Sequence, residues 1–111
     1  MNKVLIVMGS DSDLEQMRPA WRVLEELGVG YEVAVASAHR SPERVVAMAT
    51  GARAAGYGVI LAGAGGAAHL AGVIAAHTTL PVVAVPIAVG TVGGVDALLS
   101  AVQMPRGVPV A

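Results

Sequence analysis

The hexapeptide SAHRSP, residues 37–42, joins two segments of different pattern and decides how the chain folds. The apolar run at 31–36 indicates a buried strand, and residues 42–55 show the pattern of a helix that Gly56 ends. Ser41 is a favourable N-cap residue, and proline suits the first position of a helix. The hexapeptide is therefore predicted to be a strand-to-helix turn at the carboxyl end of a strand, the place where open α/β sheets bind ligands.

Strand and helix patterns alternate along the rest of the chain. Strands are predicted at residues 3–8, 59–62 and 82–85, with the start of a further strand at 108–111, and helices at about 14–27, 67–77 and 96–102. This alternation predicts one α/β domain over residues 1–111, a three-layer α/β/α structure with a doubly wound parallel sheet of the Rossmann or flavodoxin type. Because no helix follows the last strand, we expect the C-terminal end of the domain to be missing.

Composition limits the partners and the location of the protein. The 111 residues carry a net charge of −1 and include no cysteine. We therefore expect no nucleic-acid or membrane partner, no thiol chemistry, and a reducing compartment such as the cytoplasm. Hydrophobic residues make up 55% of the chain but aromatic residues only 3%, so small apolar side chains dominate. Few polar residues remain to cover a small domain, which predicts a homo-oligomer; the alternative is a monomer with an unusually apolar surface.

The first of three turns that follow predicted strands is residues 9–13, which contain serines and acids. The hydroxyl of Ser10 and backbone N–H groups at a helix N-terminus can hold a phosphate. A carboxylate such as that of Asp13 suits ribose hydroxyls, because it accepts their hydrogen bonds. The alternative is that Ser12 or Asp13 simply caps the helix that follows.

The second turn combines a group that titrates near neutral pH, His39, with a fixed cation, Arg40, and a hydroxyl, Ser37. Beside a helix N-terminus, this set suits an anionic substrate that needs a proton moved. The alternatives are a histidine that only stabilises the turn and an arginine that is a solvated surface charge.

The third segment, residues 63–69, is predicted to be a glycine turn that leads into a helix. Its spacing fits a G-x-G-x-x-A dinucleotide fingerprint, but no acidic residue occurs from 44 to 95 to bind a ribose, which argues against a nicotinamide cofactor. Such a turn can instead admit a small planar or linear group, with His69 facing it or serving as a capping or interface residue. No metal site is expected, because the histidines lack i,i+4 pairing with carboxylates and there is no thiol. From the residues alone we infer a site for a phosphorylated, ribose-like ligand with His39 as acid/base.

Four motifs, in order along the chain, resemble the signatures of the PurE family: GSDSD at 9–13, SAHRSP at 37–42, GAGGAAHL at 63–70 and VQMPRG at 102–107. The family comprises the N5-carboxyaminoimidazole ribonucleotide mutases of de novo purine synthesis and related aminoimidazole ribonucleotide carboxylases. The histidine motifs are more similar to the bacterial mutase branch. One departure is Ala71, where the family usually has proline.

The resemblance implies a Rossmann-like three-layer fold, a homo-octamer with active sites between subunits, and no metal or organic cofactor. It implies a mutase that moves a carboxylate from the exocyclic N5 of the ribonucleotide to ring carbon C4. The implied path is decarboxylation, retention of CO2 in the site as a bound intermediate, and recarboxylation at carbon.

The resemblance also assigns roles to residues: His39 matches the general acid/base, Ser10, Ser37 and Arg40 the phosphate ligands, Asp13 the ribose ligand, and Gly65, Gly66 and His69 the lining around the base and carboxylate. Two other functions remain open. One is direct carboxylation of aminoimidazole ribonucleotide or of another heteroaromatic nucleotide. The other, suggested by the expected missing end, is an inactive subunit that binds a nucleotide or supports assembly.

Overall fold

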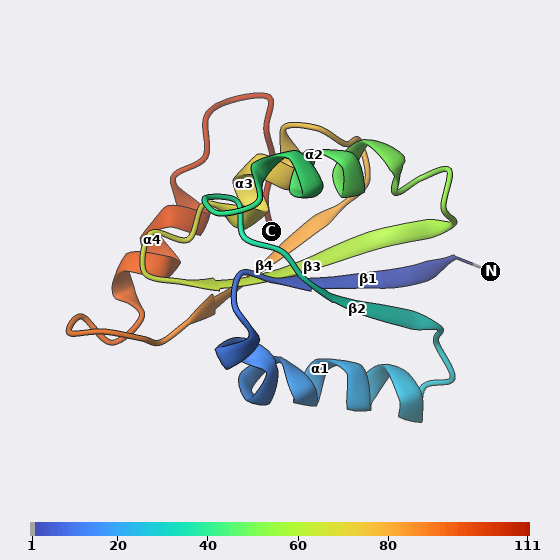
Figure 1. The fold of residues 1–111 in the computed structure, drawn as a ribbon, viewed down its shortest axis with the longest axis horizontal. Helices are drawn as coiled ribbons and strands as arrows, with labels where there is room; N and C mark the ends of the chain where they lie inside the picture. Colours follow the sequence, from blue (N-terminus) through green and yellow to red (C-terminus); the bar gives the residue numbers. More distant parts are fainter. Residues whose placement is uncertain (1) are drawn as a thin grey trace.

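The computed structural model describes residues 2–111, and within them four parallel strands form one sheet (Figure 1). The strands are β1 (Lys3–Met8), β2 (Tyr31–Val35), β3 (Tyr57–Gly65) and β4 (Val82–Ile87). Their order in the sheet is β2-β1-β3-β4, with every pair parallel. This is the start of the flavodoxin-like order, so the predicted α/β class and doubly wound parallel sheet are confirmed.

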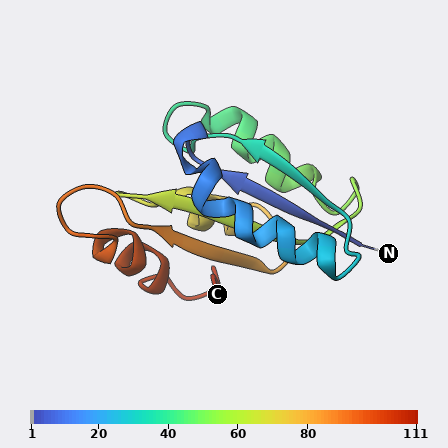
Figure 2. The same cartoon turned by 90° about the horizontal axis from the view of Figure 1, so that it is seen from below.

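Helices lie on both faces of the sheet, which gives the three predicted layers. Helix α1 (Leu14–Glu26), preceded by the short 3-10 helix η1 (Asp11–Asp13), covers one face, while α2 (Pro42–Gly51) and α3 (Leu70–Ala75) lie on the other (Figures 1 and 2). Helix α4 (Val95–Val102) packs beside β4 and the end of β3. No helix in residues 2–111 has the length and apolar character needed to cross a membrane.

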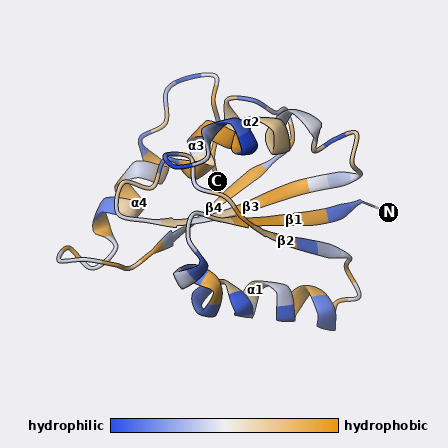
Figure 3. Ribbon diagram, in the orientation of Figure 1, coloured by the Kyte–Doolittle hydropathy of each residue, from blue (hydrophilic) through white to orange (hydrophobic). Residues whose placement is uncertain are grey.

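The central strand β1 divides the core into two clusters. Side chains alternate along a strand, so Ile6 and Met8 pack with Met17 of α1, while Leu5 and Val7 face the other helices. Ile6 and Met8 are each 0% exposed. Figure 3 shows hydrophobic residues through the middle of the sheet and alternating hydrophilic and hydrophobic residues along α1. Burial on both faces explains why this strand is a continuous apolar run.

The predicted glycine turn at 63–66 is wrong, because β3 continues to Gly65 and pairs with β4 along its whole end. These glycines serve close packing rather than a turn. A Cβ on Gly63 would collide with the sulfur of Met17, and one on Gly65 would lie 2.5 Å from Cγ2 of Val89. The chain turns only at Gly66, whose φ is +61°.

Two helices are shorter than predicted. Helix α2 ends at Gly51 rather than near residue 55, since the N–H of Ala52 bonds to the third rather than the fourth preceding carbonyl, tightening the last turn. Helix α3 spans 70–75 rather than 67–77, because the chain bends at 66–67 and has no regular structure at 68–69 before the helix begins. The first helix was predicted well, but Leu27, expected in its buried stripe, is 69% exposed because it lies beyond the last turn.

The edges of the sheet explain two further differences. Strand β2 is an edge strand with Glu32 and Val33 exposed, so it is not the buried strand that was predicted. Strand β4 continues through Pro86. The N–H of Ala84 bonds outward, to the carbonyl of Ala111 at 2.8 Å, so the missing N–H of Pro86, two residues on, costs no bond to β3. The N–H of Ala111 in turn bonds to the carbonyl of Val82 at 3.0 Å, so Ala111 pairs with β4 in the parallel pattern, but residues 108–111 do not form the strand that was predicted there.

Candidate active site

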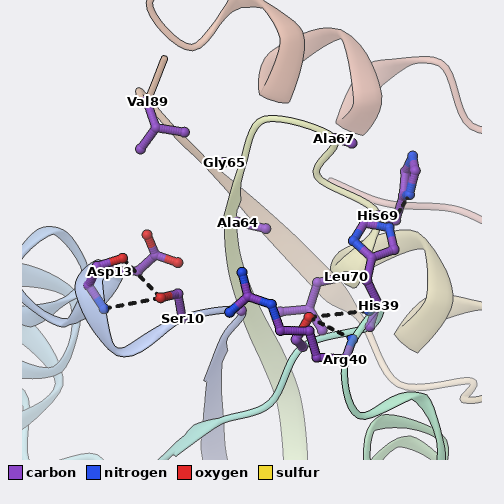
Figure 4. A pocket seen from close by; sticks show the side chains of 14 residues that line it. Ser10, Asp13, His39, Arg40, Ala64, Gly65, Ala67, His69, Leu70 and Val89 are labelled. Atoms are coloured by element: carbon purple, nitrogen blue, oxygen red, sulfur yellow. Dashed lines mark hydrogen bonds between the residues drawn. The ribbon is translucent and has the colours of Figure 1, made fainter.

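A cavity of about 360 Å³ opens at the carboxyl edge of the sheet, where the loops after all four strands meet (Figure 4). Strands β1 and β3 are neighbours there although their loops leave to opposite faces, which is the switch point where such sheets bind ligands. The residues that line the cavity are Gly9, Ser10, Ser12, Asp13, Ser37, Ala38, His39, Arg40, Ala64, Gly65, Ala67, His69, Leu70 and Val89.

Ser10 organises the loop after β1. Its hydroxyl oxygen accepts a hydrogen bond from the backbone N–H of Ser12 at 3.3 Å and lies 2.9 Å from the Ser12 hydroxyl. Ser10 is therefore the cap of η1, and neither Ser12 nor Asp13 caps α1 with its side chain, contrary to the capping alternative. The carboxyl of Asp13 is left free of that task at the cavity wall.

Asp13 is the buried acid of the site, with only 6% of its surface exposed. Burial raises the pKa of its carboxyl above the ordinary value of 3.8, and a backbone hydrogen bond at Ser10 partly offsets this effect. A buried acceptor that lines a cavity is poised to accept hydrogen bonds from a ligand, because such bonds compensate the lost hydration.

Ser37 holds the loop after β2 in shape. Its hydroxyl oxygen accepts hydrogen bonds from the backbone N–H groups of His39 at 3.2 Å and Arg40 at 3.1 Å. These bonds turn both side chains toward the carboxyl edge of the sheet. Within residues 2–111 the ion pairs are Lys3–Glu32 and Arg18–Glu15, so the guanidinium of Arg40 has no carboxylate partner there. An unpaired arginine beside hydroxyl groups suits a phosphate.

The two imidazoles of the cavity contact each other. Nε2 of His39 lies 2.6 Å from Nδ1 of His69, and the ring planes are nearly perpendicular, at 83° (Figure 4). One nitrogen must donate and the other accept, so the facing nitrogens share one proton. Charging both rings fully would set two N–H groups against each other and break the bond. The pair can therefore take up or release a proton only through its outer nitrogens or by exchanging partners with a ligand.

The structure brings together almost all of the site residues predicted from the sequence. Those that line the cavity are Ser10, Asp13, Ser37, His39, Arg40, Gly65 and His69. Gly66 is not among the lining residues; it makes the turn after β3. Within residues 2–111, no group of three His, Cys, Asp or Glu side chains is placed to hold a metal ion.

Sequence reasoning missed the apolar part of the lining, chiefly Ala64, Leu70 and Val89. Val89 follows the carboxyl end of β4, so the rule that located the other three loops would have found it if the strand had not been ended at Pro86. The polar groups of the cavity thus come from the loops after β1 and β2 and from His69, while its apolar lining comes mainly from β3 and from the segments after β3 and β4.

Comparison with known proteins identifies relatives along the whole chain. The model of the AIR carboxylase family matches residues 3–111. The N5-carboxyaminoimidazole ribonucleotide mutase of Thermotoga maritima is 54% identical over 111 residues, which are 100% of this chain and 65% of the relative. That of Pyrococcus abyssi is 58% identical over 111 residues, 100% of this chain and 64% of the relative. The chain thus spans less than two thirds of the length of these curated relatives.

Two further matches bear on activity and fold. The phosphoribosylaminoimidazole carboxylase of Schizosaccharomyces pombe is 58% identical over 106 residues, 96% of this chain and 19% of the relative. The crystal structure of Treponema denticola PurE superposes with a TM-score of 0.89 at 26% identity, covering 100% of this chain and 72% of that one.

Proposed function

The chain belongs to the AIR carboxylase family, and we propose that it acts as an N5-carboxyaminoimidazole ribonucleotide mutase in purine biosynthesis. The observation that carries this proposal is the hydrogen-bonded pair of His39 and His69 at one end of a cavity whose other groups suit a phosphorylated ribose. The reaction moves a carboxylate from the exocyclic N5 of the ribonucleotide to ring carbon C4.

The polar side of the cavity orients the substrate. Arg40 binds the phosphate together with the hydroxyls of Ser10 and Ser37. The Ser37 hydroxyl only accepts within its loop and keeps its hydrogen, and the Ser10 hydroxyl exchanges its long 3.5 Å bond to Asp11 for one to the phosphate. Asp13 accepts hydrogen bonds from the ribose hydroxyls. This orientation places the imidazole base against Gly65 and the histidine pair, because a ribonucleotide is an extended chain of phosphate, sugar and base.

The chemistry needs one proton to be delivered and one to be removed. The bond between N5 and the carboxylate carbon breaks, its electrons stay on nitrogen, and His39 supplies the proton that the nitrogen takes up. The CO2 released stays in the cavity, C4 attacks it, and the proton on C4 returns to His39. Substrate and product are isomers, so no oxidant or second substrate is consumed. Holding CO2 beside C4 replaces a bimolecular capture with an effectively unimolecular step.

His69 serves this cycle as a hydrogen-bond partner of His39. Its Nδ1 fixes the orientation of the His39 ring through the 2.6 Å contact. When His39 gives its proton to the substrate, the pair is one proton short, and the proton released from C4 restores it, so the cycle closes without a proton from solvent. Gly65 lines the same cavity with its backbone alone.

Direct carboxylation of aminoimidazole ribonucleotide is the second candidate, and the name of the fission-yeast relative favours it. Supplying each substrate separately distinguishes the two. A mutase converts N5-carboxyaminoimidazole ribonucleotide without ATP or added bicarbonate, and labelled bicarbonate in the buffer does not enter the product. Efficient turnover of aminoimidazole ribonucleotide with CO2, and none of the N5-carboxylated compound, would instead establish the carboxylase.

We further propose that the protein forms a homo-octamer in the cytoplasm, with its active sites between subunits. The support is an apolar stripe on the outer side of α4, formed by Val95, Leu98, Leu99 and Val102, which are 54%, 48%, 46% and 64% exposed. A stripe of this kind on a small domain is typical of a subunit interface. It lies next to the cavity, since Leu99 and His69 border a common recess.

A further inference from the structure

Val89 is the one cavity-lining residue, within residues 2–111, that comes from the loop after β4. Val89 belongs to the apolar lining of the cavity, and its side chain is 43% exposed. Figure 4 shows Val89 and Asp13 on the same side of the cavity, with His39 and His69 on the other. A half-exposed valine at this place is therefore available to a ligand and is not a core residue.

The position of Val89 is set by close packing against β3. A Cβ added to Gly65 would lie 2.5 Å from Cγ2 of Val89 and 3.0 Å from the carbonyl oxygen of Ile87. The valine side chain thus lies directly on the bare backbone of Gly65. Valine has few rotamers, so this contact gives the wall a fixed shape.

The chemistry of Asp13, on the same side of the cavity, shows what such a wall does. Asp13 is almost fully buried, and its hydrogen bonds to a ribose compete with water that enters the cavity. An apolar wall over the sugar excludes that water and strengthens the bonds in the drier surroundings. The sugar itself presents C–H groups that gain by contact with methyl groups.

We propose that Val89 is a substrate-positioning residue: its side chain forms the apolar wall over the ribose end of the bound ribonucleotide and shields the hydrogen bonds to Asp13. The inference rests on the proposed function, whose site it completes. It identifies the ribose, rather than the base or the carboxylate, as the part of the substrate that Val89 contacts.

The test is Val89→Ala, compared with Val92→Ala as a matched control in the same loop. Val92 is 55% exposed and does not line the cavity. Loss of two methyl groups from an apolar contact predicts a rise of about tenfold in KM for the ribonucleotide, with kcat changed less than about twofold. The control should leave both constants unchanged. An unchanged KM in Val89→Ala, or an equal effect of Val92→Ala, would overturn the inference.

Calorimetric titration with ribose 5-phosphate separates this inference from the proposed function, because that probe contains no base. Val89→Ala should weaken its binding by the same factor as that of the ribonucleotide. If the wild-type chain binds both compounds and Val89→Ala binds them equally well, the positioning role is wrong and the proposed function stands. If the wild-type chain binds ribose 5-phosphate but neither binds nor converts the ribonucleotide, the proposed function is wrong, while weaker sugar binding in the variant still supports the wall.

A paired substitution tests the contact with β3. Gly65→Ala alone should crowd Val89 and raise KM, and the double variant Gly65→Ala/Val89→Ala should recover part of that loss, since the contact with Cγ2 is removed while the carbonyl of Ile87 remains. Strictly additive effects on KM would contradict the proposed contact. Melting temperatures measured in parallel show whether any variant has lost its fold.

Discussion

At the scale of single residues, serine hydroxyl groups hold the loops that form the site. Ser37 holds the backbone N–H groups of His39 and Arg40, and Ser10 holds that of Ser12. The Ser37 oxygen only accepts, so its own hydrogen remains free, whereas the Ser10 hydroxyl also donates to the Asp11 carboxylate at 3.5 Å. The short polar motifs thus fix the loops with the same atoms that, under the proposed function, bind the substrate.

Burial of Asp13 gives a prediction for stability against pH. Its pKa in the folded protein is raised by burial, so between the ordinary value of 3.8 and the raised value the folded state binds more protons than the unfolded state. Stability contributed at Asp13 is therefore present at low pH and is lost as pH rises through that window. Asp13→Asn should have a higher melting temperature than the wild type at pH 7, and the difference should narrow toward pH 4.

The same substitution should weaken ribonucleotide binding, because an amide donates as well as accepts and carries no charge. Thermal melts from pH 4 to 8 and a calorimetric titration at pH 7 measure the two effects. A lower melting temperature for Asp13→Asn at every pH would contradict this prediction. It would show that hydrogen bonds to the carboxylate in the folded protein outweigh the cost of burying its charge.

The polar half of the site could be predicted from the sequence because its residues lie within short motifs directly after strands. His39 and Arg40 follow β2 at the carboxyl edge of the sheet, as the apolar run before them and the helix-start residues after them predict. The hydrogen bond between His39 and His69 could not be predicted, since the two residues are 30 positions apart and their contact depends on where the chain leaves β3. Val89 was missed because the predicted strand was ended at Pro86, before the true end of β4.

At the scale of elements, glycine is the residue whose meaning depends most on tertiary context. Glycine normally marks a turn, yet Gly63 and Gly65 are strand residues because Met17 and Val89 press on them. Hydrogen bonding to β1 as far as Gly63, and to β4 as far as Gly65, holds this glycine-rich segment in the extended conformation. The sequence pattern contains no sign of these neighbours, which come from α1 and from the loop after β4.

The start of α4 offers a test of backbone geometry. Gly94 is the N-cap, with φ of +93°, and an added Cβ would lie 3.0 Å from Cα of Ala88. Gly94→Ala should lower the free energy of unfolding by about 1–2 kcal/mol for the left-handed conformation, and further for the contact with the backbone. Urea denaturation followed by circular dichroism measures the loss.

Gly93 provides the matched control. Its φ is +61°, but nothing lies within 4 Å of an added Cβ. Gly93→Ala should therefore cost only the conformational part and less than Gly94→Ala. Equal losses at the two positions would mean that the contact with Ala88 has no energetic weight.

At the scale of the whole molecule, hydrophobic patterning predicts the three layers of the fold, but it does not predict the exposed apolar surface of α4. The apolar stripe formed by Val95, Leu98, Leu99 and Val102 has no covering element within residues 2–111. Small apolar residues explain why such a short chain forms a sheet with helices on both faces. The exposure of this apolar stripe is the reason to expect self-association.

A charge in the stripe tests that expectation. Leu98→Glu should reduce the mass of the assembly in sedimentation velocity and native mass spectrometry, since a carboxylate is costly to bury between subunits. Glu43→Gln, at an exposed position on α2, serves as a surface control and should leave the assembly unchanged. A wild-type chain that sediments as a monomer at all concentrations would contradict the proposed octamer.

The central claim is that His39 moves the proton in a carboxylate transfer, and the rate of that transfer tests it most directly. The measurement is conversion of N5-carboxyaminoimidazole ribonucleotide to its C4 isomer, without ATP or added bicarbonate, by the wild-type chain and by His39→Asn at equal melting temperature. We predict turnover by the wild type and a rate at least about 100-fold lower in the variant. A variant within a few-fold of the wild type, or a folded wild-type chain that gives no isomer, would contradict the claim.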